Sequence, residues 1–151
     1  VASVTGPNKG VLYEGKAVTQ EVFSKDVMAD LTYALKSVVN GGTGGAALAL
    51  GRPAAGKTGT SQSNASAWFS AYTPQLAASV ALFRDSASES LNGIGGLTSV
   101  TGGTFPAKIW TAFMKGALKD EPVMSFPAPA NIGGLEPVVM TSGGRQTMKK
   151  K

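Results

Sequence analysis

Residues 51–60 constrain the fold of this chain more than any other stretch, because their ten letters, GRPAAGKTGT, are compatible with two different structures. The first eight letters satisfy G-x-x-x-x-G-K-[ST], a glycine-rich loop that presents phosphate groups to the N-terminus of a helix. The last four letters, Lys-Thr-Gly-Thr, favour a β-strand, because threonine suits strands and Pro53 excludes a regular helix here. The neighbouring residues must decide between the two structures.

The sequence after Lys57 and Thr58 does not provide the helix that a phosphate-binding loop requires. Residues 59–64 are Gly, Thr, Ser, Gln, Ser and Asn, which carry no apolar stripe. No crossover helix fits between this stretch and the apolar run that ends at Arg84 and Asp85. The pattern therefore predicts a strand over 54–61, followed by strands over 67–73 and 76–83 in an antiparallel meander.

Helical periodicity occurs on both sides of these strands. A helix is predicted over 25–39, with Ser24 as its N-cap and Asp26 in its first turn, and a brief helical turn over 46–50. A second helix is predicted over 105–119, with Pro106 in its first turn. Its apolar stripe comprises Ile109, Trp110, Phe113, Met114 and Leu118. We expect an α+β fold in which these two helices pack against the antiparallel sheet.

The remaining segments are less regular. One or two short strands are predicted near Val11, Tyr13 and Val18, and a loop over 86–103. We expect one domain over 1–119 and a Pro/Gly-rich tail over 120–151, partly laid on the surface through Phe126 and Ile132. The side chains expected in the core are Trp68, Phe69, Trp110, Met28 and Met114.

Composition limits the chemistry that is available. The chain has no His and no Cys, so any catalysis must use Lys, Ser, Thr, Tyr or carboxylates, and we expect neither a metal nor a cofactor. The net charge of +5 includes three terminal lysines, Lys149, Lys150 and Lys151, and the other charges are scattered, which does not favour nucleic-acid binding. No window is apolar enough for a membrane span, and the first residues do not form a signal peptide.

The chain resembles the transpeptidase domain of class A penicillin-binding proteins, in particular actinobacterial members, over about residues 11–134. The segments that carry the resemblance are AGKTGT at 55–60, AWFSAYTP at 67–74, residues 26–39 with Gly42-Thr43-Gly44, GGTFPAKIW at 102–110, and Phe126-Pro127. Lys-Thr-Gly is one of the signatures of such enzymes and of class A β-lactamases. Ser66 departs from the pattern, since many relatives have an acidic residue before Ala-Trp-Phe.

The resemblance implies a penicillin-binding/serine β-lactamase-like fold and roles for four residues. Lys57 would be a cation near the catalytic serine and the substrate carboxylate, and Thr58 and Thr60 would hydrogen-bond that carboxylate. The backbone N–H of Thr60 would be one of two oxyanion-hole donors. Gly59 would leave room for the peptide to approach the strand. Catalysis would therefore involve Lys57 and Thr60, and substrate binding Thr58, Gly59 and Thr60.

The resemblance also shows what this sequence lacks. No lysine has a serine three positions before it, so the S-x-x-K nucleophile motif is absent. Ser90-Leu91-Asn92 matches S-x-N, but it follows Lys57 instead of preceding it, and we interpret it as ordinary loop structure. The simplest explanation is that this chain is the C-terminal half of the domain, with both motifs on an N-terminal part that is the partner of this chain.

The leading hypothesis is thus a peptidoglycan D,D-transpeptidase that binds stem peptides and β-lactams. It would act at the outer face of the cytoplasmic membrane, anchored by a segment outside this sequence. A D,D-carboxypeptidase or β-lactamase of the same fold, a nucleotide-binding protein that uses residues 51–58, and a non-catalytic wall-binding module remain alternatives. Magnesium-dependent nucleotide binding would favour the second of these. Lasting absence of an S-x-x-K partner would favour the third.

Overall fold

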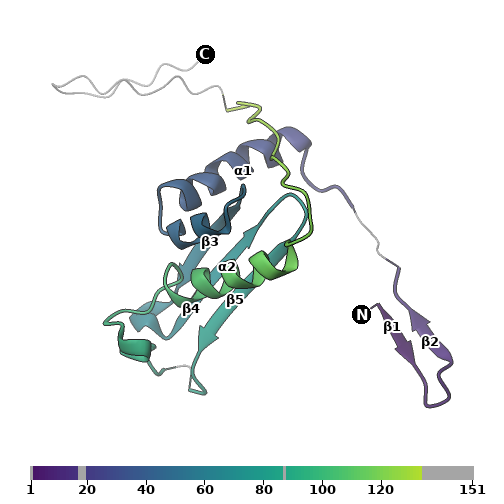
Figure 1. Cartoon of the computed structure of the whole chain (residues 1–151), viewed down its shortest axis with the longest axis horizontal. Helices are drawn as coiled ribbons and strands as arrows, with labels where there is room; N and C mark the ends of the chain where they lie inside the picture. Colours follow the sequence, from purple (N-terminus) through teal and green to yellow (C-terminus); the bar gives the residue numbers. More distant parts are fainter. Residues whose placement is uncertain (1, 17–19, 87, 134–151) are drawn as a thin grey trace.

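A computed structural model describes residues 2–16, 20–86 and 88–133. The main body is an antiparallel sheet of β3 (Ala55–Thr60), β4 (Ser66–Tyr72) and β5 (Ala77–Phe83), in that order. The helix α2 (Phe105–Ala117) lies across one face of this sheet, and α1 (Lys25–Asn40) lies beside β3 (Figure 1). The three predicted strands and two predicted helices are therefore confirmed, with ends within about two residues.

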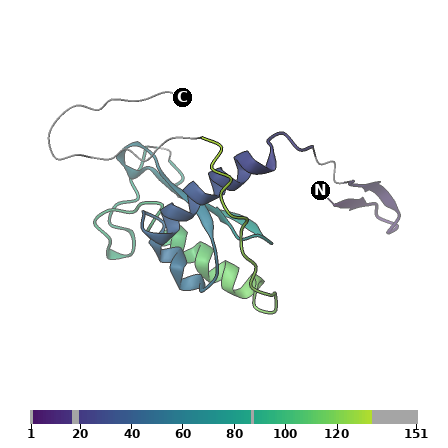
Figure 2. The same ribbon diagram turned by 90° about the horizontal axis from the view of Figure 1, so that it is seen from above.

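Shorter elements complete the described chain. The 3-10 helices are η1 (Gly45–Leu50), η2 (Gln62–Asn64) and η3 (Ile94–Gly96), of which η1 confirms the predicted helical turn. At the N-terminus, β1 (Ser3–Thr5) pairs antiparallel with β2 (Val11–Glu14), and this hairpin is set apart from the main body in both views (Figures 1 and 2). The sequence did not indicate β1. The predicted strand residue Val18 is outside the described residues.

Local signals in the sequence explain where α1 begins. The Ser24 hydroxyl accepts a hydrogen bond of 3.3 Å from the backbone N–H of Val27, which satisfies one of the free donors of the first turn. Asp26 places a negative charge near the positive end of the helix dipole. At the other end, the N–H of Gly41 bonds to the Ser37 carbonyl, and the chain then turns through residues 42–44 toward η1.

The core lies between α2 and the covered face of the sheet. Trp110 of α2 and Phe69 of β4 are both fully buried and meet edge to face, with ring centroids 5.4 Å apart. The Trp110 indole N–H donates to the carbonyls of Ala71 and Ala78, at 3.2 and 3.1 Å. Such an aromatic pair contributes about 0.5–1.5 kcal/mol beyond its buried area. The core positions of Phe69, Trp110 and Met114 are confirmed.

Two core predictions were wrong. Trp68 is 44% exposed because β4 turns its neighbours Ala67 and Phe69 inward, and side chains alternate along a strand. Met28 is 40% exposed because the buried side of α1 includes its neighbour Ala29, about 100° around the helix.

The apolar stripe predicted for α2 is also displaced. Its buried residues are Pro106, Ala107, Trp110, Thr111 and Met114, with Leu118 following at the C-cap. Ile109 and Phe113 lie on the outer side, 45% and 55% exposed. Of the predicted stripe, only Trp110, Met114 and Leu118 face the core.

The segment after α2 is held against the body of the protein. Phe126 meets Tyr72 edge to face at 5.5 Å, and the Tyr72 hydroxyl lies 2.9 Å from the Thr32 hydroxyl of α1. Further along, the carboxylate of Asp30 accepts hydrogen bonds from the backbone N–H groups of Asn131 and Ile132, at 2.8 and 2.9 Å. The segment therefore runs from the end of α2 past α1 (Figures 1 and 2).

Candidate functional site

The Lys-Thr-Gly-Thr stretch forms most of β3, which is an outer strand of the sheet because only β4 pairs with it in the part of the chain that the structure describes. Alternation along the strand places Lys57 and Gly59 on one face and Thr58 and Thr60 on the other. Lys57 and Thr60 are exposed, and Thr58 and Gly59 are half-buried. The four predicted site residues therefore lie together on one accessible strand.

The pairing of β3 determines which backbone groups face outward. The N–H of Ser61 donates to the carbonyl of Ser66 at 3.0 Å, so this pair belongs to the hydrogen-bonded set of the antiparallel ladder. Because hydrogen-bonded and non-hydrogen-bonded pairs alternate, the N–H and C=O groups of Thr58 and Thr60 point away from β4. The N–H of Thr60 is thus directed to the outer edge of the sheet.

The Lys57 side chain lies at this same edge. Its ammonium donates a hydrogen bond of 2.9 Å to the carbonyl of Thr58. A lysine offers three donors and no acceptor, so two of its N–H donors are available to other groups besides this carbonyl. The cation, two hydroxyls and the outward N–H are all donors that suit an anionic ligand.

Each threonine hydroxyl has a partner from a different part of the chain. The Thr58 hydroxyl lies 2.6 Å from the hydroxyl of Thr43, in the turn between α1 and η1. The Thr60 hydroxyl accepts a hydrogen bond of 3.2 Å from the backbone N–H of Gly102. The sequence included Thr43 and Gly102 in the segments that resembled a known family, but it assigned neither of them a role, because both contacts span long separations.

Close packing explains the glycines around these hydroxyls. A Cβ atom on Gly102 would overlap the carbonyl oxygen of Trp68 and lie 2.8 and 2.9 Å from the backbone O and N of Gly59. A Cβ atom on Gly103 would overlap the carbonyl oxygen of Thr43. The Gly102-Gly103 turn therefore packs directly against β3 and the Thr43 turn.

Gly59 has its own steric constraint. A Cβ atom there would lie 3.3 Å from the Cβ of Trp68, its cross-strand neighbour, which is tighter than ordinary contact. Gly59 therefore leaves the face of the strand that carries Lys57 without a side chain at this position.

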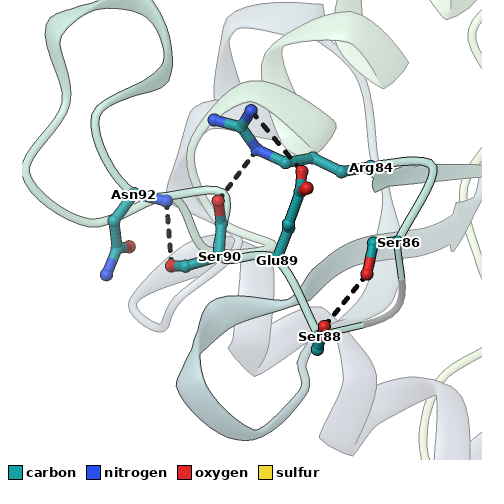
Figure 3. Close-up of polar contacts among 6 residues, drawn as sticks. All are labelled: Arg84, Ser86, Ser88, Glu89, Ser90 and Asn92. Atoms are coloured by element: carbon teal, nitrogen blue, oxygen red, sulfur yellow. Dashed lines mark hydrogen bonds and ion pairs between the residues drawn. The ribbon is translucent and has the colours of Figure 1, made fainter.

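Ser90 belongs to a hydrogen-bonded loop (Figure 3). Its hydroxyl accepts from the N–H of Asn92 at 3.1 Å, and its carbonyl accepts from Arg84 Nε at 2.9 Å. Arg84 also forms an ion pair with Glu89 at 3.9 Å. The Asn92 side-chain oxygen accepts from Asn64 Nδ2 at 2.7 Å. The interpretation of this segment as loop structure is confirmed.

The structure does not have the geometry of a phosphate-binding loop at residues 51–58. β3 continues through Lys57 and Thr58 to Thr60, and the next element is η2, a single turn of 3-10 helix. No helix N-terminus follows the lysine, so the backbone donors that hold phosphates in such loops are not assembled. The nucleotide-binding alternative required that geometry at residues 51–58, and the structure therefore excludes it.

Two further properties concern metals and membranes. Across residues 2–16, 20–86 and 88–133, no group of three or more His, Cys, Asp or Glu side chains is placed to hold a metal ion. None of the helices in those ranges has the length and apolar character needed to cross a membrane.

Comparison with known proteins identifies the family. Residues 8–91, more than half of the chain, match the family described as the penicillin binding protein transpeptidase domain. The chain belongs to this family. The match includes β3 and the turn that carries Thr43.

Curated relatives place the chain among class A penicillin-binding proteins, including actinobacterial ones. Penicillin-binding protein 1A of Mycolicibacterium smegmatis is 38% identical over 120 residues, which is 76% of this chain and 15% of that protein. Penicillin-binding protein 1A of Mycobacterium tuberculosis is 33% identical over 141 residues, 89% of this chain and 17% of that protein. The chain thus spans less than a fifth of these relatives.

Solved structures of penicillin-binding proteins share the fold. The penicillin-binding protein PonA1 from Mycobacterium tuberculosis superposes with a TM-score of 0.74 and 29% identity, over 99% of this chain and 41% of that one. A second structure, of PonA1 in complex with penicillin V, gives a TM-score of 0.69 and 33% identity over 87% of this chain and 36% of that one. The predicted α+β penicillin-binding fold is confirmed.

Proposed function

We propose that this chain forms one wall of the active site of a peptidoglycan D,D-transpeptidase. The observation that carries the proposal is the outward direction of the Thr60 N–H on an accessible outer strand, next to Lys57 and the hydroxyls of Thr58 and Thr60. A substrate that ends in a carboxylate and passes through an oxyanion needs this set of donors. Membership of the transpeptidase family supports the same assignment.

The proposed reaction begins when a serine Oγ attacks the carbonyl carbon between the last two residues of a D-Ala-D-Ala stem peptide. The Thr60 N–H stabilises the negative charge on that carbonyl oxygen, while Thr58 and Thr60 bind the terminal carboxylate. The terminal D-Ala leaves with its electron pair and a proton, and an amine of a neighbouring stem peptide then takes the acyl group from the serine. Removal of one oxyanion donor typically costs about 10²- to 10³-fold in rate.

The serine belongs, in this proposal, to an S-x-x-K segment on an N-terminal part of the domain, outside the printed sequence. That segment also contributes the second oxyanion donor and places its serine and lysine near Lys57. A β-lactam would acylate the same serine and remain attached. No metal or cofactor enters any step, and the site would lie at the outer face of the cytoplasmic membrane, anchored by another segment.

A fluorescent penicillin tests the proposal on the complete domain. Replacing Lys57 with Ala should slow labelling by about 10- to 100-fold, the cost of a hydrogen bond to a charged group. Lys108→Ala, which removes an exposed lysine from α2, should leave labelling unchanged. The 151-residue chain alone, which lacks the S-x-x-K segment, is the negative control and should form no covalent adduct.

Undiminished labelling of the Lys57→Ala domain would refute the assignment of this strand to the site. A covalent adduct on the 151-residue chain alone would place the nucleophile within that chain. Incubation with a stem peptide and an amine acceptor then separates the chemistry: a cross-linked product indicates transpeptidation, and release of free D-Ala alone indicates a carboxypeptidase. Failure of the complete domain to label would favour a binding module without catalysis.

A further inference from the structure

The hydroxyls of Thr58 and Thr60 share one property that the proposed reaction does not explain: each is within hydrogen-bond distance of a polar group from another part of the chain. For Thr60 this group is the backbone N–H of Gly102, which can only donate. For Thr58 it is the hydroxyl of Thr43, 2.6 Å away, where either oxygen can be the donor.

Binding of an anion would determine the direction of the second hydrogen bond. A hydroxyl has one proton to donate, and a carboxylate can only accept. If Thr58 donates its proton to a carboxylate, the 2.6 Å contact can persist only with Thr43 donating to Thr58. Thr58 would then accept from Thr43 and donate to the carboxylate. Thr60 can already do the same, because the Gly102 N–H donates to its hydroxyl.

We infer that Thr43 is a positioning residue for recognition of the substrate carboxylate, which it achieves through Thr58. The Thr43 hydroxyl holds the Thr58 hydroxyl in the rotamer that directs its proton to the anion. Two hydrogen bonds in series also polarise each other, so the second is stronger than it would be alone. The inference rests on the proposed function, because it assumes a carboxylate ligand at Thr58.

The backbone around Thr43 is held in place for this role. The N–H of Gly44 bonds to the Val38 carbonyl at 2.8 Å, and a Cβ atom on Gly44 would lie 3.0 Å from the Phe69 ring. On the other side, the carbonyl of Thr43 is in close contact with Gly103. The Thr43 side chain itself is exposed, so its hydroxyl can be removed without opening a cavity in the core.

The test compares acylation of the complete domain by a penicillin and by its methyl ester, which lacks the carboxylate charge. Thr43→Val, which is nearly isosteric, should slow acylation by the acid about 3- to 10-fold, the cost of one hydrogen bond, and leave the ester unaffected. Thr43→Ser should restore the rate for the acid. Thr98→Val, at an exposed threonine of the loop before α2, is the matched control.

A double-mutant cycle gives an independent measurement. If Thr43 acts through Thr58, Thr43→Val should have no additional effect in a Thr58→Val background. Equal losses for acid and ester, additive effects in the cycle, or no loss with Thr43→Val would each overturn the inference. Failure of the unmodified domain to react with penicillin would instead refute the proposed function, so the two failures can be told apart.

Discussion

Replacing Gly102 with Ala should damage the site from a position outside β3. The added methyl group would overlap the Trp68 carbonyl and approach the backbone O and N of Gly59 to 2.8 and 2.9 Å. All three are backbone atoms of paired strands, so no flexible side chain can move aside. Either the turn at residues 102–103 or the Lys-Thr-Gly-Thr strand must shift.

The size of the effect follows from two contributions. Overpacking of this kind costs about 1–3 kcal/mol, and the hydrogen bond from the Gly102 N–H to the Thr60 hydroxyl contributes about 0.5–1.5 kcal/mol that a shifted turn would lose. We therefore expect the free energy of unfolding to fall by about 1.5–4.5 kcal/mol. Penicillin labelling of the complete domain should slow as well, because the Thr60 hydroxyl loses its fixed orientation.

Urea unfolding measures the first effect, and labelling under conditions where the variant is fully folded measures the second. Gly116→Ala is the matched control: its Cβ meets nothing within 4 Å, and alanine in α2 should stabilise the protein by up to about 1 kcal/mol. If Gly102→Ala unfolds at the same urea concentration as the unmodified protein and labels normally, the steric reasoning is refuted.

Two further changes test other parts of the structure. Trp110→Phe should lower the free energy of unfolding by about 1–3 kcal/mol in a urea titration. The substitution removes the indole N–H that bonds to two carbonyls and leaves a smaller ring in the core. An unchanged midpoint would contradict this. Hydrogen bonds from the backbone N–H of Asn131 and, to a smaller extent, of Ile132 hold the pKa of Asp30 below its ordinary value of 3.8. Their contribution to stability should thus be complete above that value and be lost as the pH falls through the lower folded-state pKa. Hydrogen-exchange protection of these two amides measures this loss, and protection that survives in Asp30→Ala at neutral pH would refute it.

The sequence was sufficient for the two helices and the three strands of the main sheet, including the strand that carries the site, but not for β1. Threonine content, turn residues and apolar runs located β3 to β5, and the cap at Ser24 with helical periodicity located α1, because these signals are local. The faces were harder to predict. Trp68 and Met28 are apolar residues beside other apolar residues, and periodicity does not say which of two neighbours is buried.

The contacts that hold the Thr58 and Thr60 hydroxyls could not be predicted from the sequence, because they depend on tertiary packing. Thr43 reaches Thr58 across 15 residues, and Gly102 reaches Thr60 across 42. Nothing in the local sequence marks a hydroxyl as the partner of another hydroxyl so far away. The contact of Asp30 with residues 131 and 132 is of the same kind.

Arg52 has a mechanical consequence, because it connects the end of α2 to the start of β3. Its guanidinium donates to the carbonyls of Leu118, Glu121 and Pro122, and β3 begins three residues later, at Ala55. A pull on the chain beyond residue 133 would load the Asp30 contact first, then the Phe126 and Tyr72 pair, and then Arg52. Tension along the C-terminal segment would therefore be carried by α1 at Asp30 and by β4 at Tyr72 before it reached Arg52.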